Sequence, residues 1–236
     1  MKYMPYSNQK KGMFLAFVAV IFITPDSLLI RLANLTSWDL IFYRGFIPFF
    51  IVFAGLLIIY KSKFISQLLE NGWHGAAYAV TFAITNIFFV ISINNTNVAN
   101  TLIMIALAPM LSAVISFIFL KESTDQKTWI AITITTLAVI YIFNDSFEKG
   151  DVLGNFLGLV CAAGLAAGAV IIRSAKKINL VPSAMMGKLL VALIAFFFTE
   201  SLILKGSDAI IIPVMCIVCV AIPFVLITLA PRYITA

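Results

Sequence analysis

The stretch Trp38–Tyr60, WDLIFYRGFIPFFIVFAGLLIIY, decides the fold class of this chain. It runs for 23 residues, and Asp39 and Arg44 are its only charged members. A helix needs about 20 mostly apolar residues to cross the ~30 Å hydrocarbon core of a membrane. Lipid offers no partner to backbone N–H and C=O groups, so a spanning segment must pair them within a helix. The stretch therefore predicts a transmembrane α-helix.

Seven more apolar runs of similar character lie along the chain. None of them alternates with the period of two that is typical of outer-membrane β-strands. Together with the first run they predict an all-α polytopic membrane protein with eight transmembrane helices. The predicted spans are 13–32, 38–60, 75–94, 98–120, 128–144, 153–173, 183–204 and 209–230.

The composition agrees with this prediction. Of the 236 residues, 62% are hydrophobic and 11% are charged, and the mean hydropathy is +1.08. A soluble domain is about half apolar and about a quarter charged. These values exclude a soluble enzyme, a nucleic-acid-binding domain and a disordered tail. The net charge of +6 is therefore interpreted as a topology signal and not as a nucleic-acid-binding surface.

Basic residues between the predicted spans indicate the orientation, because cytoplasmic loops carry the excess of Lys and Arg. With the N-terminus inside, three basic residues lie outside: Arg31, Lys149 and Lys205. Eleven lie inside: Lys2, Lys10, Lys11, Lys61, Lys63, Lys121, Lys127, Arg173, Lys176, Lys177 and Arg232. We therefore predict a multi-pass protein of the plasma (inner) membrane, with residues 1–12 as a cytoplasmic segment.

The three cysteines, Cys161, Cys216 and Cys219, all lie inside apolar runs. An odd number with none in a loop argues against a disulfide framework. Cys216 and Cys219 form a CxxC, but no further ligand is near, so we interpret them as small apolar residues on one helix. No metal or cofactor is expected. An intramembrane enzyme is disfavoured as well, because the chain has one histidine and lacks the motifs of membrane hydrolases.

The chain contains a weak internal repeat. When residues 12–45 are aligned with 154–187, eight positions are identical, including Arg31 with Arg173 and Gly45 with Gly187. The first copy, 13–146, would hold five spans, so the second copy, 147–236, would enter the membrane in the opposite sense. Inverted repeats recur in secondary transporters, which bind substrate near the middle of the membrane at the interface between the copies.

Four stretches resemble a known family in their order and spacing. They are Thr24–Arg31 followed by Tyr43-Arg44-Gly45, the polar turn and helix of Asn95–Pro109, Leu120-Lys121-Glu122 followed by Trp129, and the ending Ala230–Ala236. In these stretches the chain resembles the EamA-type members of the drug/metabolite transporter superfamily.

The resemblance implies two inverted five-helix repeats around a central cavity that opens alternately to each side. It implies transport of a small metabolite, an amino-acid-like solute or a drug. The second copy holds three predicted spans where the family has five, so the chain is expected to be truncated after the eighth span. Two alternatives therefore stay open: a non-transporting fragment, or a part whose cavity is completed by a second chain or a homodimer.

Ionisable groups inside predicted spans are costly in lipid and mark candidate sites. Arg44 lies six residues into the second span. It would contact an anionic group of a solute or a gating carboxylate, or it would form a structural ion pair or reach the outer surface. Asp39 is a nearby candidate partner. If Arg44 serves transport, Arg44→Ala is expected to abolish transport and leave folding largely intact.

Two further ionisable groups are candidates for contact with solute or ion. Asp26 follows a proline in the first span, where it would bind a proton or cation, or form a salt bridge with Arg44 or Arg31. Lys188 lies five or six residues into the seventh span and roughly mirrors Arg44 in the repeat. It would contact solute, or it would extend to the inner surface.

Neutral polar groups form a second set of candidates. Thr85 and Asn86 in the third span and Thr101 in the fourth would line a cavity and hydrogen-bond a polar solute. Small polar residues also form packing seams between membrane helices, which is the alternative for this set. An unpaired amide in lipid is costly, so cavity lining is favoured for Asn86.

Three prolines fall inside predicted spans: Pro25, Pro109 and Pro223. Proline lacks the backbone N–H that a helix needs and clashes with the preceding turn. These positions are therefore expected to bend spans one, four and eight, either as static kinks or as hinges for conformational change.

Overall fold

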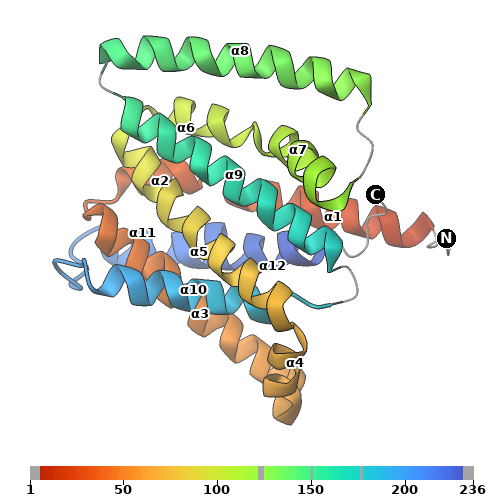
Figure 1. The fold of residues 1–236 in the computed structure, drawn as a ribbon. Helices are drawn as coiled ribbons and strands as arrows, with labels where there is room; N and C mark the ends of the chain where they lie inside the picture. The colour runs from red at the N-terminus through yellow and green to blue at the C-terminus, as the bar shows by residue number, and fades with distance from the viewer. Residues whose placement is uncertain (1–5, 122–124, 150, 176–177, 231–236) are drawn as a thin grey trace. The chain divides into compact units, whose positions relative to one another are not determined.

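The computed structural model describes residues 6–121, 125–149, 151–175 and 178–230 (Figure 1). Within these ranges every regular element is helical. In this described part of the chain, seven helices are long and apolar enough to cross a membrane, and Val181–Phe196 is a shorter apolar helix. The predicted all-α polytopic membrane fold is confirmed. Several residues used in the predictions lie outside the described ranges: Lys2, Glu122, Lys176, Lys177, Arg232 and the rest of 231–236.

The helices follow the predicted spans closely, although three spans are interrupted. Their bounds are α1 Tyr6–Ile23, α2 Asp26–Leu32, α3 Ser37–Tyr60, η1 Lys61–Lys63, α4 Phe64–Glu70, α5 Gly72–Asn95, α6 Val98–Ile105, α7 Ala108–Leu120, α8 Gln126–Lys149, α9 Val152–Ser174, α10 Val181–Phe196, α11 Asp208–Val214, η2 Met215–Ala221 and α12 Ile222–Leu229.

The chain divides into two compact units. Unit 1 consists of Met1–Ala83 and Ile171–Ala236, and unit 2 consists of Ile84–Val170. Helices α5 and α9 each contribute residues to both units. The repeat boundaries inferred from the sequence remain a prediction.

In unit 1, α10 packs along α3, and α12 packs against α1 (Figure 1). Two glycines that the repeat alignment pairs make close approaches here. A Cβ on Gly45 would lie 2.6 Å from the backbone nitrogen of Ala192 and 2.8 Å from the carbonyl oxygen of Lys188. A Cβ on Gly187 would lie 2.8 Å from the carbonyl oxygen of Ala79. Small residues let membrane helices approach at such points, so both glycines are required by packing.

Each of the three predicted bends coincides with an irregularity of the helix. Pro25 lies between α1 and α2, and Pro109 is the second residue of α7, after the helix interruption at Ala106 and Leu107. Pro223 is the second residue of α12 and follows η2, a π-helix. Proline deprives the carbonyl four residues earlier of its partner. For Pro109 that carbonyl belongs to Ile105, the last residue of α6.

The seventh predicted span, 183–204, is too long at its C-terminal end. Helix α10 ends at Phe196, and its 16 residues span about 24 Å at 1.5 Å per residue. The segment 197–207 that follows contains no regular helix. We call it the α10–α11 segment. It is apolar in its first residues, which is why hydropathy extended the span into it.

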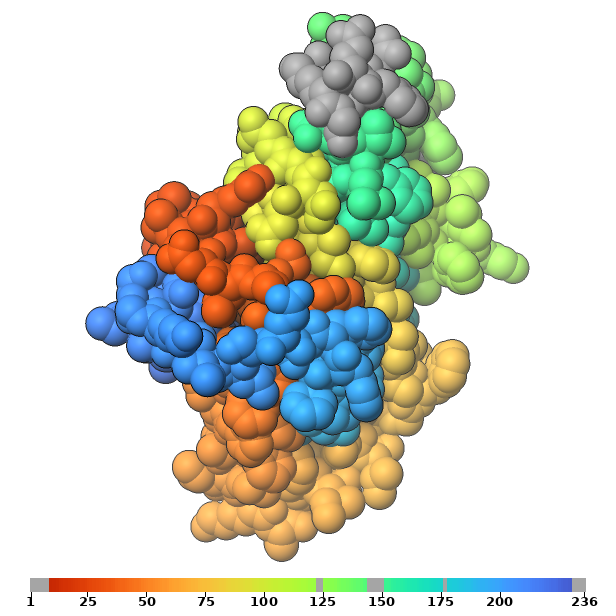
Figure 2. Space-filling model, turned by 90° about the vertical axis from the view of Figure 1, so that its left-hand side faces the viewer, coloured from red at the N-terminus to blue at the C-terminus, as the bar shows by residue number. Residues whose placement is uncertain are grey.

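Side chains at the start of α3 hold the α10–α11 segment in place. Oδ1 of Asp39 accepts hydrogen bonds from the backbone N–H groups of Glu200, at 2.9 Å, and Ser201, at 3.3 Å. The rings of Trp38 and Phe198 stack with centroids 4.6 Å apart. Figure 2 shows the orange-red atoms of α2 and α3 directly against the blue atoms of this part of the chain. These contacts replace the helical hydrogen bonds that the segment lacks.

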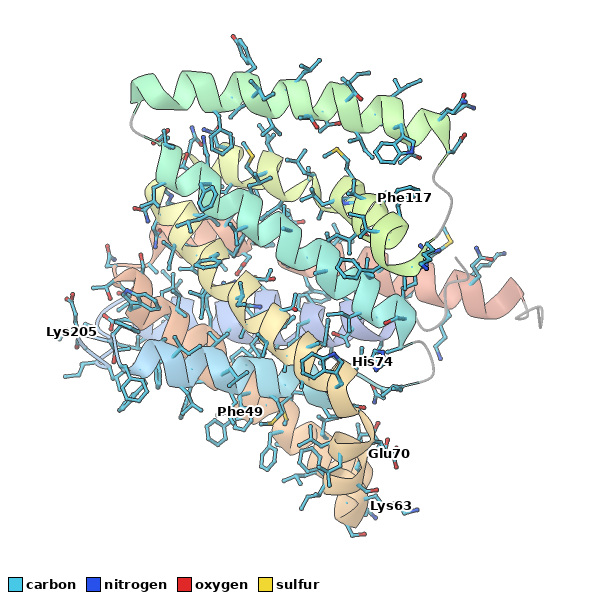
Figure 3. The ribbon with its side chains drawn as sticks, viewed as in Figure 1. Phe49, Lys63, Glu70, His74, Phe117 and Lys205 are labelled. Carbon is cyan, nitrogen blue, oxygen red and sulfur yellow. The ribbon has the colours of Figure 1, made fainter. Side chains whose placement is uncertain are left out.

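Charged and polar side chains lie at the two ends of unit 1. Lys63, Glu70 and His74 lie near one end, where α4 meets α5, and Lys205 lies at the opposite end (Figure 3). His74 is exposed near the start of α5. This arrangement is typical of a bundle whose polar ends face water and whose middle faces lipid.

Unit 2 holds α6, α7, α8 and parts of α5 and α9. The hydroxyls of Ser92 and Thr101 lie 2.8 Å apart, and Ser92 also donates to the carbonyl oxygen of Gly154 at 2.7 Å. Phe117, labelled in Figure 3, meets Trp129 edge-on with centroids 5.6 Å apart. None of the apolar window of α8 is buried. The side chains of Gln126–Phe143 are therefore available to lipid.

Candidate functional site

Five charged side chains are buried in the described part of unit 1. Two of them, Asp39 and Asp208, accept hydrogen bonds from backbone N–H groups. The other three are the ionisable candidates that the sequence singled out. Asp26 begins α2, Arg44 lies in the second turn of α3, and Lys188 lies in the middle of α10. Their exposed fractions are 1%, 4% and 1%. We call these three residues the charged cluster. The sequence singled out each of them separately, and the structure brings them together.

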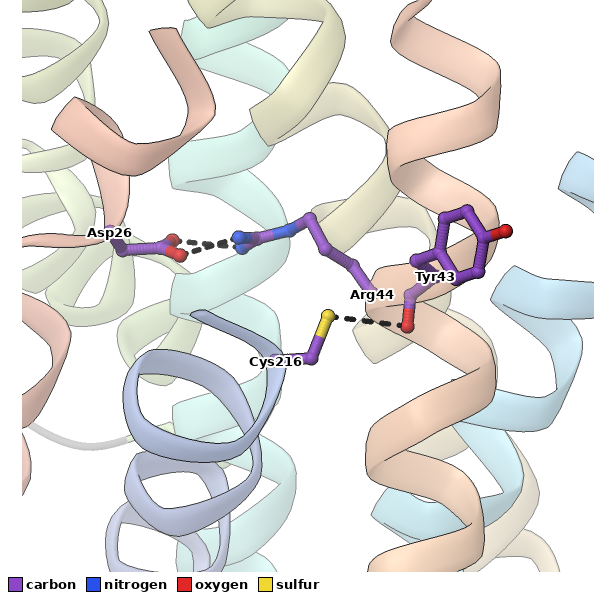
Figure 4. A network of polar contacts seen from close by, with 4 residues as sticks. All are labelled: Asp26, Tyr43, Arg44 and Cys216. Atoms are coloured by element: carbon purple, nitrogen blue, oxygen red, sulfur yellow. Dashed lines mark hydrogen bonds and ion pairs between the residues drawn. The ribbon is translucent and has the colours of Figure 1, made fainter. Parts of the chain in front are cut away.

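Asp26 and Arg44 form a two-pronged ion pair (Figure 4). Nη1 of Arg44 donates to Oδ1 of Asp26 at 2.5 Å, and Nη2 donates to Oδ2 at 2.8 Å. A planar guanidinium matches a carboxylate in this way, and the geometry fixes both side chains. Asp39, the other candidate partner of Arg44, binds the α10–α11 segment instead. The ion pair therefore joins α2 to α3 immediately after the interruption at Pro25.

Lys188 does not extend to the inner surface, because its side chain is fully buried. The interpretation as a surface-reaching lysine is wrong. Its Nζ lies 5.2 Å from the centroid of the Phe82 ring and 5.9 Å from that of Phe224. It also interacts electrostatically with Arg44 and Asp26. Such ring contacts stabilise an ammonium group by about 0.5–2 kcal/mol, well below what water provides.

Cys216 lies beside the charged cluster, although the sequence was interpreted as giving it only a packing role. Its thiol donates to the carbonyl oxygen of Tyr43 at 3.4 Å, next to Arg44 in the chain (Figure 4). It interacts electrostatically with Arg44, Lys188 and Asp26. Cys216 lies in η2, and π-helical turns often occur at functional sites. The CxxC pattern marked the position, but its apolar surroundings favoured a packing role.

The neutral polar candidates lie in unit 2. Thr101 is fully buried and shares its hydroxyl hydrogen bond with Ser92. Thr85 is buried on α5, and Asn86, the next residue, is half-buried. The contacts of Thr101 fit the packing alternative, whereas a cavity-lining role for Thr85 and Asn86 remains a prediction.

Two buried polar pairs in unit 1 were not anticipated. The amide nitrogen of Asn71 donates to the hydroxyl of Ser183 at 2.7 Å, and the hydroxyls of Tyr78 and Thr228 lie 3.3 Å apart. Each pair joins α10 or α12 to the start of α5. Sequence alone could not have paired residues more than a hundred positions apart.

In the part of the chain that the structure describes, no three His, Cys, Asp or Glu side chains gather as a metal site would require. The expectation that no metal or cofactor is bound remains a prediction. A carboxylate, a guanidinium and an ammonium group can instead exchange ionic partners, bind a charged solute group or exchange protons.

Comparison with known proteins addresses the identity of the chain. A solved structure titled "Crystal structure of protein" matches with a TM-score of 0.71 at 17% identity, covering 96% of this chain and 81% of that chain. At that identity the likeness concerns the fold alone. No curated protein matches. The model of the EamA-like transporter family matches residues 10–144, more than half of the chain. The chain belongs to the EamA-like transporter family and is a membrane transporter of small solutes.

Proposed function

We propose that this chain moves a small metabolite, an amino-acid-like solute or a drug across the plasma membrane by alternating access. In this proposal the N-terminus is cytoplasmic, and the charged cluster is where solute or a coupling ion is contacted. Membership of a transporter family supports transport itself. The burial of three ionisable side chains in one place within the spans carries the assignment of the site.

Energetics support this assignment. Ionised side chains inside a membrane protein cost several kcal/mol, and a pair retained there rarely adds stability over apolar residues of the same size. Such groups are expected where function requires them. With exposed fractions of 4% or less, the charged cluster is closed to solvent in this conformation. A solute can reach it only if the surrounding helices open.

The helix interruptions supply positions at which such opening would occur. Pro25 precedes Asp26 directly, and the π-helical η2 carries Cys216. A proline break and a π-helix both weaken the regular hydrogen bonding of a helix. A change at Pro25 would move Asp26 relative to Arg44 and Lys188, and a change in η2 would move Cys216 relative to the charged cluster.

Accessibility of Cys216 tests alternating access without knowledge of the substrate. A variant with Cys161→Ser and Cys219→Ser keeps Cys216 as its only thiol. Right-side-out and inside-out membrane vesicles are treated with a membrane-impermeant maleimide. We expect slow labelling of Cys216 from both sides, because a transporter exposes its site to each side in turn.

The controls are single thiols at exposed positions. Ser62→Cys and Ser207→Cys, each in a chain without native cysteines, are expected to be labelled quickly and from one side only. Labelling of Cys216 from neither side, with these controls reactive, would reject alternating access and favour the non-transporting fragment. Labelling from one side only would indicate a dead-end cavity.

A further inference from the structure

We infer that η1 and α4 form a binding surface for the headgroups of anionic lipids. Lys61 and Lys63 of η1 contact the phosphate of the headgroup, and the exposed apolar side chains of α4 contact the upper part of the acyl chains. The partner is therefore a bilayer that contains an acidic phospholipid. Such a surface is independent of the solute that the chain transports.

The length of one helical stretch places α4 at the membrane surface. Helices α3, η1 and α4 follow one another directly, so Ser37–Glu70 forms a stretch of 34 residues. At 1.5 Å per residue, the 24 residues of α3 alone extend about 36 Å, which is more than the ~30 Å hydrocarbon core. Because α3 fills the core, η1 and α4 lie at the depth of the lipid headgroups.

Both ends of this short stretch are fixed near the start of α10. The amide nitrogen of Asn179 donates to the hydroxyl of Tyr60 at 2.5 Å, immediately before η1. The amide nitrogen of Asn71, immediately after α4, donates to the hydroxyl of Ser183 at 2.7 Å. Phe64, the first residue of α4, is buried in the core of unit 1. The inner face of α4 is therefore held against the protein, and its outer face points away from it.

The outer face of α4 has the two-sided character of an interfacial helix. Ile65 and Leu69 are four residues apart on one face, with exposed fractions of 67% and 73%. Trp73, shortly after α4, is 81% exposed. Ser66 and Glu70, also four residues apart and exposed, form an adjoining polar face. A helix of this kind lies between the headgroups and the acyl chains, which is also where tryptophan is enriched.

Two lysines give this surface a preference for anionic headgroups. Lys61 and Lys63 begin and end η1, and both are exposed. The carboxylate of Glu70 accepts hydrogen bonds within its own helix, from Gln67 at 2.7 Å and Ser66 at 3.4 Å. Within the described ranges neither lysine forms an ion pair, so both ammonium groups are available to a lipid phosphate.

The charge of the stretch has the sign that acidic lipids require. Two lysines and one glutamate give Lys61–Glu70 a net charge of +1. Lys63 and Glu70 lie at the same end of unit 1 (Figure 3). With the cytoplasmic N-terminus proposed above, this end faces the inner leaflet, whose acidic lipids attract basic residues beside a membrane span.

Quenching of tryptophan fluorescence by brominated lipids measures which lipid lies beside α4. Trp38→Phe combined with Trp129→Phe leaves Trp73 as the only tryptophan. The full chain is reconstituted in vesicles of equal parts phosphatidylglycerol and phosphatidylcholine, with bromine on the acyl chains of one lipid or the other. We expect stronger quenching by brominated phosphatidylglycerol, corresponding to an enrichment of about fivefold for one net positive charge. The enrichment should fall as salt is added.

Variants of the two lysines test the origin of this preference. Lys61→Gln combined with Lys63→Gln should abolish it, whereas Lys61→Arg combined with Lys63→Arg should keep it. Lys205→Gln is the matched control, because it removes an exposed lysine at the opposite end of unit 1 and should change nothing (Figure 3). The salt dependence tests the same point in a chain that keeps both lysines.

Three outcomes would overturn the assignment. Equal quenching by the two brominated lipids, or a preference that survives the loss of both lysines, would show that the surface does not select anionic headgroups. Quenching by neither lipid would show that Trp73 lies in water or against another protein copy, and that α4 is not a lipid-binding surface. None of these results depends on the labelling of Cys216, which tests alternating access separately.

Discussion

At the scale of single residues, the ion pair between Asp26 and Arg44 means that a substitution of either residue affects folding as well as transport. Arg44→Ala was expected from the sequence to leave folding largely intact. In the structure that change would leave the carboxylate of Asp26 buried beside Lys188 alone. Removing one partner of a buried pair costs about 3–5 kcal/mol, since the remaining charge stays out of water. Loss of transport in Arg44→Ala alone would therefore not separate a functional role from a folding defect.

A double variant separates the two roles. Asp26→Leu is expected to lower the free energy of unfolding by about 3–5 kcal/mol, because Arg44 loses the carboxylate that binds it. Asp26→Leu combined with Arg44→Met removes both charges and should regain most of that loss. Reversible unfolding in a detergent–lipid mixture measures the free energy of unfolding of both variants and of Arg44→Met alone.

The unmodified chain, the two single variants and the double variant form a double-mutant cycle. This cycle gives the interaction free energy between the side chains of Asp26 and Arg44. If the two single losses simply add in the double variant, the side chains do not interact and the ion pair is not formed in the protein. If the double variant is stable and still transports solute at the normal rate, the charged cluster is not the transport site. A stable double variant without transport supports the proposal.

At the scale of elements, the early end of α10 is explained by contacts from α3. Asp39 accepts two backbone N–H groups, and the hydroxyl of Tyr43 donates to the carbonyl oxygen of Leu202 at 2.6 Å. Asn34, just before α3, donates its N–H to the carboxylate of Asp208 at 3.2 Å. Asp39 and Tyr43 therefore hold the α10–α11 segment on α3. Asn34 holds Asp208, the first residue of α11, just after this segment.

Asp39→Ala is expected to loosen the α10–α11 segment. A hydrogen bond to a charged group contributes about 1.5–3 kcal/mol, so the amides of Glu200 and Ser201 should exchange with deuterium roughly ten to a hundred times faster. Hydrogen–deuterium exchange with mass spectrometry measures this directly. Asp39→Asn, which keeps an acceptor oxygen, should give an intermediate rate.

The control for this experiment is Glu200→Ala, because the Glu200 side chain is exposed and its backbone N–H is unchanged. Exchange in that variant should match the unmodified chain. Equal exchange in Asp39→Ala and in the unmodified chain would mean that the Trp38–Phe198 stack and the Tyr43 hydrogen bond hold the segment without the carboxylate.

At the scale of the whole molecule, the number of membrane crossings depends on whether α10 spans. Its 16 residues are fewer than the about 20 that a straight crossing needs, although the apolar start of the α10–α11 segment adds length. A short helix is accommodated by local thinning of the bilayer at modest cost. We expect α10 to cross, since Lys63 and Lys205 lie at opposite ends of unit 1 (Figure 3).

Labelling of single thiols decides this point. In a chain without native cysteines, Ser62→Cys precedes α4 and Ser207→Cys precedes α11. If α10 crosses, an impermeant maleimide reaches Cys at 62 only in inside-out vesicles and at 207 only in right-side-out vesicles. Reaction of both positions from the same side would show that α10 does not span, and the reverse sidedness would contradict the cytoplasmic N-terminus.

Local composition predicted most of the fold. Seven of the eight predicted spans are helices of membrane-spanning length, and Trp38–Tyr60 corresponds to α3 within one residue. Pro25 and Pro109 predicted the breaks in two spans. These features depend on hydropathy and on the missing proline N–H, both of which act within a few residues. The resemblance to the EamA family rested on four short stretches and agrees with the family match.

The sequence by itself determined that this is an all-α membrane protein of a transporter family, and it identified the ionisable groups within its spans. Only the tertiary structure decided that Arg44 pairs with Asp26 and not Asp39, that Lys188 and Cys216 join them, and where α10 ends. The physical reason is the distance along the chain over which each feature is determined. Burial in lipid is encoded residue by residue, whereas the partner of a charge depends on which helix faces meet.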